Sequence, residues 1–280
     1  MVFKPNNVTP VNPTVPVVSV NPKFLALNTG INDYPGSGND LNGCINDCLD
    51  WNSPLARQYG FKTTLLRDRE CTSSATISWL RDAVSKAGDG WHIVWTYSGH
   101  GSNVPDSDGD EPDSRDECLC LYDRFLIDDE IRGILKNLHP LAKFTFISDS
   151  CHSGTVTRAF MSTLDVNAAY AKPRFLPPVD NPNDAVAPTS LGRFMEPQES
   201  SMNEVLISGC LPTEYSYDAN LNGRYNGAMT YYAVNILKQT PNITYKDFYT
   251  QLRKSLPNSR YPQTPQLEGK EENKNRLMFT

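Results

Sequence analysis

The chain has 280 residues, a net charge of −6 and an isoelectric point near 5.3. This length predicts one large α/β domain or two small ones, and the negative charge argues against a general nucleic-acid binder, which needs a basic face. No apolar run approaches the roughly 18 residues of a membrane helix, and the N-terminal stretch lacks the apolar segment of a secretory signal. We therefore expect no contact with nucleic acid or membrane.

The first 22 residues mix prolines with asparagine, threonine and valine, which predicts an extended Pro-rich arm outside the core. Apolar and β-branched runs after it predict buried strands, and apolar residues at helical spacing predict helices between them. The expected strands cover residues 24–31, 62–68, 92–99, 118–123, 143–148 and 203–210, with one more in the C-terminal tail. The expected helices cover residues 40–58, a segment capped by Ser73 or Ser74, a segment that starts at Asp128 or Asp129, and residues 227–239 and 244–256.

This alternation of strands and helices predicts an α/β fold, with a mostly parallel central sheet flanked by helices on both faces. Residues 155–200 break the rhythm, because prolines recur there among polar residues. Connections of that length are usually functional or disordered, so we expect a long and partly mobile loop.

The seven cysteines are odd in number and widely spaced, which argues against a disulfide framework and favours a reducing cytoplasm. The pairs Cys44 with Cys48 and Cys118 with Cys120 lack the spacing of zinc motifs. We therefore expect the cysteines to be free thiols that form neither disulfides nor a zinc site.

Two of the expected strands end in reactive residues. One ends in YSGHG with His100, and the other ends in SDSCHSG with Cys151. The carboxyl ends of parallel strands meet at one edge of a sheet, where sites of α/β proteins lie. His100 also precedes Cys151 by about 50 residues, which is the chain order of caspase-type proteases. The pattern predicts a cysteine nucleophile with a histidine base.

Chemistry explains the pairing, since a thiol is a poor nucleophile until an imidazole takes its proton. The backbone N–H groups of Gly101 and Cys151 are the candidates for an oxyanion hole. His152 is an unsuitable base, because neighbouring side chains point in different directions. A serine hydrolase would need G-x-S-x-G, and the serines near Cys151 are not in that frame.

From residue 24 to the C-terminus, the sequence resembles a metacaspase, a caspase-like cysteine peptidase of the type I or bacterial kind without a prodomain. The motifs that carry the resemblance are YSGHG (97–101), DSDGDEPDSRDE (106–117), DDE (128–130), DSCHSG (149–154) and QTPQLEG (263–269). The resemblance implies a single caspase-like domain over residues 23–280, after an arm at 1–22. Its parts would be a large-subunit-like segment 23–158, a Pro-rich loop 159–200 and a small-subunit-like segment 201–280.

The resemblance implies a Cys151–His100 dyad and a monomeric endopeptidase that cleaves peptides or proteins after Arg or Lys. Its acidic specificity pocket maps onto Cys44, Asp47, Ser98 and Asp149. Physical chemistry supports this, because a guanidinium inside a pocket requires carboxylate partners. Simple packing is the alternative role for Cys44, and capping of a helix is the alternative for Asp149.

Residues 106–117 carry seven carboxylates, which repel one another unless they are solvated or hold a cation. They do not form an EF-hand, because the sixth position is Glu111 where that loop requires glycine. The resemblance implies calcium activation through Asp116, Asp128 and Asp129, and no organic cofactor. Arg158 stands where a fourth acid is expected, and its charge would oppose calcium.

Residues 155–200 also contain basic residues at which such an enzyme could cut itself, namely Arg158, Lys172, Arg174 and Arg193. Cleavage after Lys172 is disfavoured by Pro173. Three alternatives remain open at this point: a catalytically silent caspase-like interaction module, a calcium-binding regulatory protein, and a related peptidase with another specificity.

Overall fold

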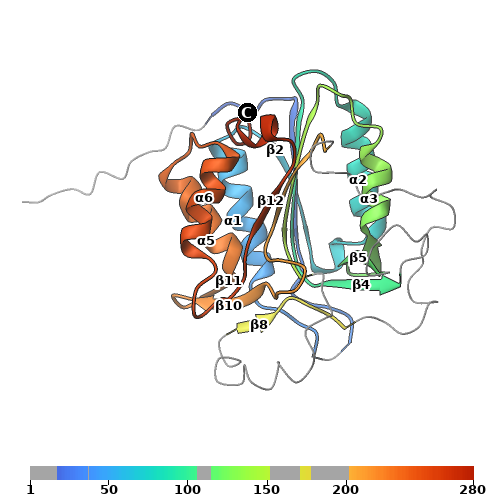
Figure 1. The fold of residues 1–280 in the computed structure, drawn as a ribbon. Helices are drawn as coiled ribbons and strands as arrows, with labels where there is room; N and C mark the ends of the chain where they lie inside the picture. Colours follow the sequence, from blue (N-terminus) through green and yellow to red (C-terminus); the bar gives the residue numbers. More distant parts are fainter. Residues whose placement is uncertain (1–17, 37, 106–114, 152–170, 178–201) are drawn as a thin grey trace, which may run out of the picture.

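A six-stranded sheet lies at the centre of the computed structural model, which describes residues 18–36, 38–105, 115–151, 171–177 and 202–280 (Figure 1). The strand order is β12-β9-β7-β3-β1-β2, and all neighbours are parallel except β12 with β9. The strands are β1 (Phe24–Gly30), β2 (Lys62–Arg67), β3 (His92–Ser98), β7 (Lys143–Asp149), β9 (Val205–Ser208) and β12 (Gln266–Glu268). The predicted fold class, a mostly parallel sheet with helices on both faces, is confirmed.

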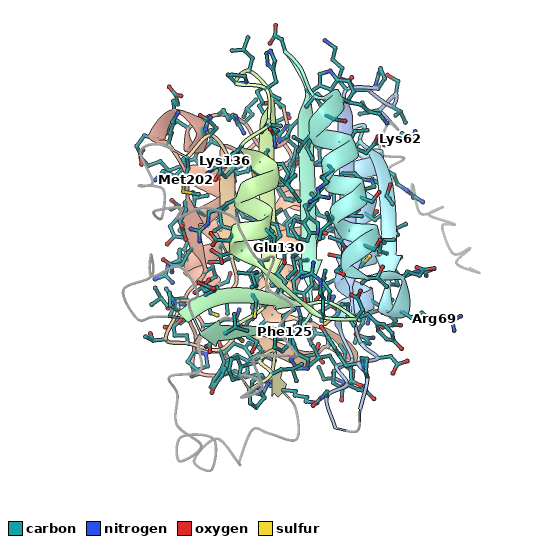
Figure 2. All side chains as sticks on the ribbon, turned by 90° about the vertical axis from the view of Figure 1, so that its right-hand side faces the viewer. Lys62, Arg69, Phe125, Glu130, Lys136 and Met202 are labelled. Atoms are coloured by element: carbon teal, nitrogen blue, oxygen red, sulfur yellow. The ribbon has the colours of Figure 1, made fainter. Side chains whose placement is uncertain are left out.

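The helices form a layer on each face of the sheet. Figure 1 shows α1, α5 and α6 on one side and α2 and α3 on the other, and Figure 2 shows α2 and α3 side by side. Their bounds are α1 Cys44–Arg57, α2 Ser73–Lys86, α3 Asp128–Leu135, α5 Ala228–Gln239 and α6 Tyr245–Ser255. The described residues also contain a 3₁₀ turn, Asp68–Glu70, and a short helix α7, Glu271–Lys274.

The central strands are apolar throughout because both of their faces are covered. Every residue of β3 is buried, and alternate side chains enter different cores. Val94 joins the cluster under α1, α5 and α6, whereas Ile93 and Trp95 join the cluster under α2 and α3. His92 is also fully buried and lies within 3.1 Å of the Thr145 hydroxyl, so it is a packing residue.

The predicted cap of α2 is wrong by one residue. Thr72 is the N-cap, and its side chain accepts a hydrogen bond from the Ala75 N–H. Ser73 lies inside the helix, where its N–H and hydroxyl donate to the Asp123 carboxylate at 2.7 and 2.8 Å. A threonine with an extended backbone is the better cap because its oxygen can reach the free N–H two or three residues on.

Replacing Thr72 by alanine should lower the free energy of unfolding by about 1 kcal/mol, because this free N–H loses its acceptor. Urea denaturation of the Thr72→Ala variant would measure the change, in a Cys151→Ala background that lacks the expected nucleophile. Ser74→Ala is the control, since Ser74 is exposed on the same turn. Equal destabilisation by both changes would contradict the cap assignment.

Two small antiparallel sheets lie at the carboxyl edge of the main sheet. One contains β4 (Gly101–Pro105), β5 (Arg115–Cys120) and β6 (Phe125–Ile127); the other contains β8 (Ala171–Pro173), β10 (Tyr217–Leu221) and β11 (Arg224–Gly227). The strand expected at 118–123 therefore begins and ends earlier, because β5 pairs with β4 across the acidic segment. Asp116 and Glu117, expected in a loop, lie on β5.

The prediction that residues 155–200 form an irregular loop is wrong for residues 171–177. This segment contains β8, which pairs antiparallel with β10, and Arg174 in it is completely buried. The pairing partner is distant in sequence, so no local pattern indicates the strand. The other residues of the expected loop lie outside the described part of the chain, as do residues 1–17 of the arm.

Strand register places the two reactive loops together. In the parallel β3–β7 pair, Ser98 is the Cα partner of Asp149. His100 and Cys151 each follow this paired position by two residues. Both therefore emerge at the same edge of the sheet, on adjacent strands.

Candidate active site

His100 is buried and tightly fixed by its surroundings. Its backbone N–H donates to the Tyr34 hydroxyl at 2.8 Å, and the two rings pack with centroids 4.8 Å apart. The ring Nε2 lies 2.6 Å from the carbonyl oxygen of Asn39. A carbonyl can only accept, so Nε2 carries the proton and the neutral ring keeps the lone pair of Nδ1 free. Nδ1 is buried and has no hydrogen-bond partner among the described residues.

The surroundings of His100 keep its ring neutral. Burial lowers its pKa to about 4, because the charged imidazolium is poorly solvated there. The backbone carbonyl groups of Asn39 and Arg174 oppose this shift, whereas the positive charges of the Lys172 and Arg174 side chains add to it. A neutral ring with a free buried nitrogen can accept a proton.

The sulfur of Cys151 is fully buried beside the loop that follows β9. The Ser216 N–H donates to Sγ at 2.7 Å, and Sγ lies 3.3 Å from the Ser216 carbonyl oxygen. The thiol of Cys210 also forms a hydrogen bond with Cys151, and this bond, followed by burial, raises the pKa of Cys210 well above its usual value. Cys210, like Ser216, is a neighbour that the sequence did not single out.

The backbone around Cys151 holds residue Arg174 as a peptide substrate would be held. The Arg174 carbonyl oxygen accepts hydrogen bonds from the N–H groups of Gly101 at 3.0 Å and Cys151 at 3.2 Å. These are the two donors that the sequence predicts for an oxyanion hole. The Arg174 N–H in turn donates to the Ser216 carbonyl at 2.9 Å. The Arg174 carbonyl carbon therefore belongs to the peptide bond that lies at Cys151.

The side chain of Arg174 fills an acidic pocket. Its Nη2 lies 2.6 Å from Asp47 Oδ2 and 3.1 Å from Asp218 Oδ1, and its Nη1 lies 3.5 Å from Asp149 Oδ2. Nη1 also donates to the Asp149 carbonyl at 3.0 Å. All four side chains are at most 1% exposed. The pocket therefore holds the Arg174 guanidinium through several charged contacts in a dry environment.

Two of the pocket carboxylates lie at the start of helix α5, which stabilises their negative charge. Asp47 accepts from the Gly227 N–H at 3.0 Å, and Asp149 accepts from the Thr230 N–H at 2.9 Å. Free N–H groups and the positive end of the helix dipole favour anions at this position. Gly227 is also required by space, because a Cβ there would collide with the Asp149 carboxylate and the Arg174 guanidinium.

The third carboxylate, Asp218, was not predicted from the sequence. It lies on β10 and accepts hydrogen bonds from the N–H groups of Asn42 at 2.7 Å and Gly43 at 2.9 Å, at the start of α1. The available signal was a single acid inside the aromatic stretch 215–219. Cys44 and Ser98, which were predicted to line the pocket, are buried beside it, but no hydrogen bond joins either side chain to Arg174 in the described part of the chain.

The acids predicted to bind calcium lie around the start of α3. The Nη2 atom of Arg132 lies 2.6 Å from Asp128 and 3.1 Å from Asp129. Burial raises the pKa of Asp128 to about 7, and the nearby charges of Asp129, Glu117 and Asp116 raise it further against the effect of Arg132. Within the described residues, no three His, Cys, Asp or Glu side chains converge closely enough to hold a metal ion. Two of the three acids, Asp128 and Asp129, are thus paired with Arg132, and the described residues do not form a ready ligand set.

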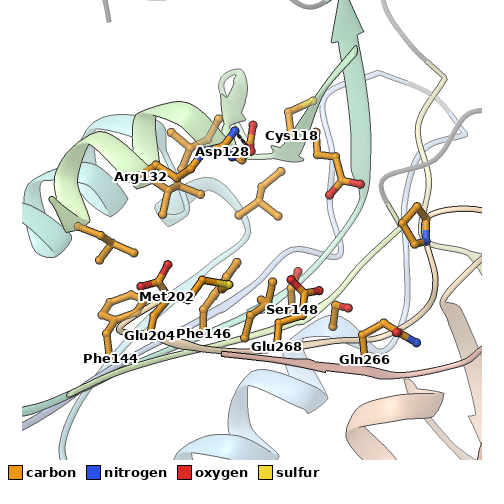
Figure 3. A pocket seen from close by; sticks show the side chains of 18 of the residues that line it. Cys118, Asp128, Arg132, Phe144, Phe146, Ser148, Met202, Glu204, Gln266 and Glu268 are labelled. Atoms are coloured by element: carbon orange, nitrogen blue, oxygen red, sulfur yellow. Dashed lines mark ion pairs between the residues drawn. The ribbon is translucent and has the colours of Figure 1, made fainter. Parts of the chain in front are cut away.

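A separate cavity of about 310 Å³ lies between α3 and the sheet (Figure 3). Phe144 and Phe146 line it from β7, Asp128 and Arg132 line it from α3, and Cys210 lines it from the loop after β9. None of the three carboxylates that contact Arg174 belongs to this lining. The cavity is therefore not the pocket that holds the arginine.

Several predicted residues lie outside the described part of the chain. These are His152, Arg158 and Arg193, together with the first acids of the segment 106–117. The expectations attached to them remain predictions.

The Caspase domain family matches residues 23–275, which is nearly the whole chain. The chain belongs to the caspase family of cysteine peptidases. Metacaspase-1 of Scheffersomyces stipitis is 28% identical to this peptidase over 281 residues, with 86% of this chain and 69% of the relative covered. Metacaspase-1 of Yarrowia lipolytica is 30% identical over 288 residues, with 88% and 61% covered.

Solved structures agree with the fold. A crystal structure of a Geobacter sulfurreducens protein is 27% identical to the peptidase, with a TM-score of 0.71 and coverage of 92% of this chain and 99% of that one. Caspase-1 from Spodoptera frugiperda is 12% identical, with a TM-score of 0.57 and coverage of 96% and 97%, and this supports the fold alone.

The relatives make this peptidase a metacaspase-like cysteine endopeptidase, a hydrolase, and favour an active enzyme over a silent module. Every helix in the described part of the chain is too short or too polar to cross a membrane.

Proposed function

We propose that the peptidase cleaves peptide bonds after Arg, and less efficiently after Lys, with Cys151 as nucleophile and His100 as base. One observation carries the proposal: Arg174 has its side chain in the acidic pocket and its carbonyl oxygen on the N–H groups of Gly101 and Cys151. A substrate arginine in the same position would present its carbonyl carbon to the sulfur.

In the proposed reaction, Sγ of Cys151 bonds to the carbonyl carbon of the arginine while His100 Nδ1 takes the thiol proton. The oxygen becomes negative and is stabilised by the Gly101 and Cys151 N–H groups, which can contribute roughly 3–4 kcal/mol. The C–N bond then breaks, and His100 returns the proton to the leaving amine. Water hydrolyses the thioester and releases the new carboxylate.

The pocket geometry favours Arg over Lys. A guanidinium presents several donors in one plane, and here they meet Asp47, Asp149 and Asp218. A lysine carries a single ammonium group on a stem that matches this planar set less well. We expect kcat/KM to be about tenfold higher for Arg peptides, a difference of about 1.4 kcal/mol.

Self-processing is part of the proposal, because the arginine in the pocket belongs to the same chain. Lys172, two residues earlier, donates from Nζ to the carbonyl oxygens of Gly38 at 2.8 Å and Asp40 at 2.7 Å. The segment is thus anchored at Lys172 and at Arg174, and only the second anchor places its carbonyl at Cys151. The bond offered for cleavage is Arg174–Phe175.

Calcium activation, which the resemblance implies, is a separate proposal. Asp116, Asp128 and Asp129 lie near one another, but Arg132 already pairs with two of them. A cation would have to displace this arginine. The reaction above therefore contains no calcium step.

We also propose that the peptidase works as a monomer in the cytoplasm. All seven cysteines are free and buried, which fits a reducing compartment.

The proposed function is tested with fluorogenic peptides that end in Arg, Lys or Asp, with calcium or a chelator. We expect turnover of Arg and Lys peptides, none of Asp peptides, and a loss of about 10⁴-fold or more in Cys151→Ala and His100→Ala. Turnover of Asp peptides alone would contradict the pocket assignment, and no turnover of any peptide would contradict the protease. Equal rates with calcium and with chelator would remove the calcium proposal.

A further inference from the structure

The two residues after Arg174 also form backbone and side-chain contacts with the rest of the protein. The Leu176 N–H donates to the Gly101 carbonyl at 3.0 Å, and the Ser102 hydroxyl donates to the Leu176 carbonyl at 2.9 Å. Gly101 also forms a parallel β-bridge with Phe175. The chain beyond the Arg174 carbonyl therefore runs along the start of β4, with both polar backbone groups of Leu176 paired.

The two side chains beyond this carbonyl meet separate apolar surfaces. Phe175 packs against the cluster that contains Tyr215, with ring centroids 6.1 Å apart and planes tilted by 52°. Leu176 packs against the other cluster, the one under α2 and α3. Both side chains are partly buried, whereas Pro177 is exposed. Within the described segment, the apolar contacts after the Arg174 carbonyl are thus made by Phe175 and Leu176.

Ser102 connects this binding to the machinery of the site. It is completely buried on β4, directly after Gly101, whose N–H contacts the Arg174 carbonyl. A buried hydroxyl needs an acceptor, and the substrate-like segment supplies one through its own backbone. Leu176 lies on the C-terminal side of the Arg174–Phe175 bond. The Ser102 contact therefore binds the part of a substrate that leaves as the amine product, and not the acyl part that stays bonded to the sulfur.

We propose that Ser102 and the Gly101 carbonyl form a binding subsite for the second residue after the cleaved bond. The preferred substrates then have an aromatic residue directly after the arginine, which packs against Tyr215. The residue after that is aliphatic, as Leu176 is. This inference rests on the proposed function, since it treats Arg174–Phe175 as the bond to be cut.

Two substrates measure the contribution of this subsite apart from that of the arginine pocket. One is Ala-Lys-Pro-Arg-aminomethylcoumarin, which has no amino acid after the arginine. The other is an internally quenched peptide, Ala-Lys-Pro-Arg-Phe-Leu-Pro. We expect Ser102→Ala to lower kcat/KM for the long peptide about fivefold relative to the coumarin substrate, the size of one neutral hydrogen bond. Ser148→Ala is the matched control, because its buried hydroxyl pairs with Ser150 and the ratio should stay at the wild-type value.

Modified peptides test the subsite without changing the protein. N-methylation of the leucine removes its N–H, and glycine in place of Phe or Leu removes the apolar contacts; each should lower kcat/KM severalfold for the wild type. Equal kcat/KM for all the long peptides, or an equal loss on both substrates in Ser102→Ala, would overturn the subsite. Failure to cut either substrate would overturn the proposed function, and the subsite with it.

Discussion

The purified peptidase should cut itself between Arg174 and Phe175, giving fragments 1–174 and 175–280, while Cys151→Ala stays intact. The bond is already held in the site, with its carbonyl on two N–H donors and its arginine among three carboxylates. Reaction within one chain needs no encounter, so its rate should not change with protein concentration. Mass spectrometry and N-terminal sequencing from Phe175 would identify the bond.

The same contact predicts a lag before added peptides are hydrolysed. Arg174 fills the pocket that a substrate arginine needs, so turnover should begin only as the chain is cut. Arg174→Lys keeps the positive charge and should self-process about tenfold more slowly, whereas Arg174→Gln should not be cut at this position. Lys172→Ala is the control for a basic residue that does not lie at Cys151. Cleavage only after other basic residues, or a rate that rises with concentration, would contradict self-processing at Arg174.

The sequence indicates His100 and Cys151 clearly because each follows a buried strand. Apolar, β-branched runs identify β3 and β7, and parallel strands bring their carboxyl ends to one edge. The register, with Ser98 opposite Asp149, then places the two loops side by side. Local patterns and one general rule of sheet topology were sufficient to predict that these two loops lie together.

The occupant of the site could not be predicted, because it depends on pairing between distant segments. Four basic residues lie in residues 155–200, and composition does not distinguish Arg174 from the others. Only β8 pairing with β10 sets which arginine reaches the pocket. Asp218 was missed for the same reason, since β10 is short and its partners lie far away in sequence. Asn39 contacts His100 through a backbone carbonyl, which any residue could supply.

Asp47→Asn should have the largest effect on specificity. We expect kcat/KM for Arg peptides to fall about 10²-fold, because the guanidinium loses a charged hydrogen bond at 2.6 Å in a fully buried pocket. A neutral asparagine also leaves the adjacent Gly227 N–H with a weaker acceptor. Asp50→Asn is the matched control, since Asp50 lies one turn further along α1 and pairs with Arg224 near the surface. An equal loss in both variants would show a general effect on α1.

The pH dependence of KM is a second test of the role of the Asp47 carboxylate. Burial raises the pKa of Asp47 to about 6, and the charge of Arg174 limits that rise. A raised pKa means that the carboxylate gains a proton as pH falls through about 6, and a neutral acid no longer attracts the arginine of a substrate. This value includes the lowering effect of Arg174, so the pKa of Asp47 is higher once the pocket of the self-processed enzyme is empty. KM for Arg peptides should therefore rise as pH falls from 7 toward 6, and this rise should be absent in Asp47→Asn. A wild-type KM that stays constant between pH 7 and 5 would show that the charge of Asp47 does not contribute to binding.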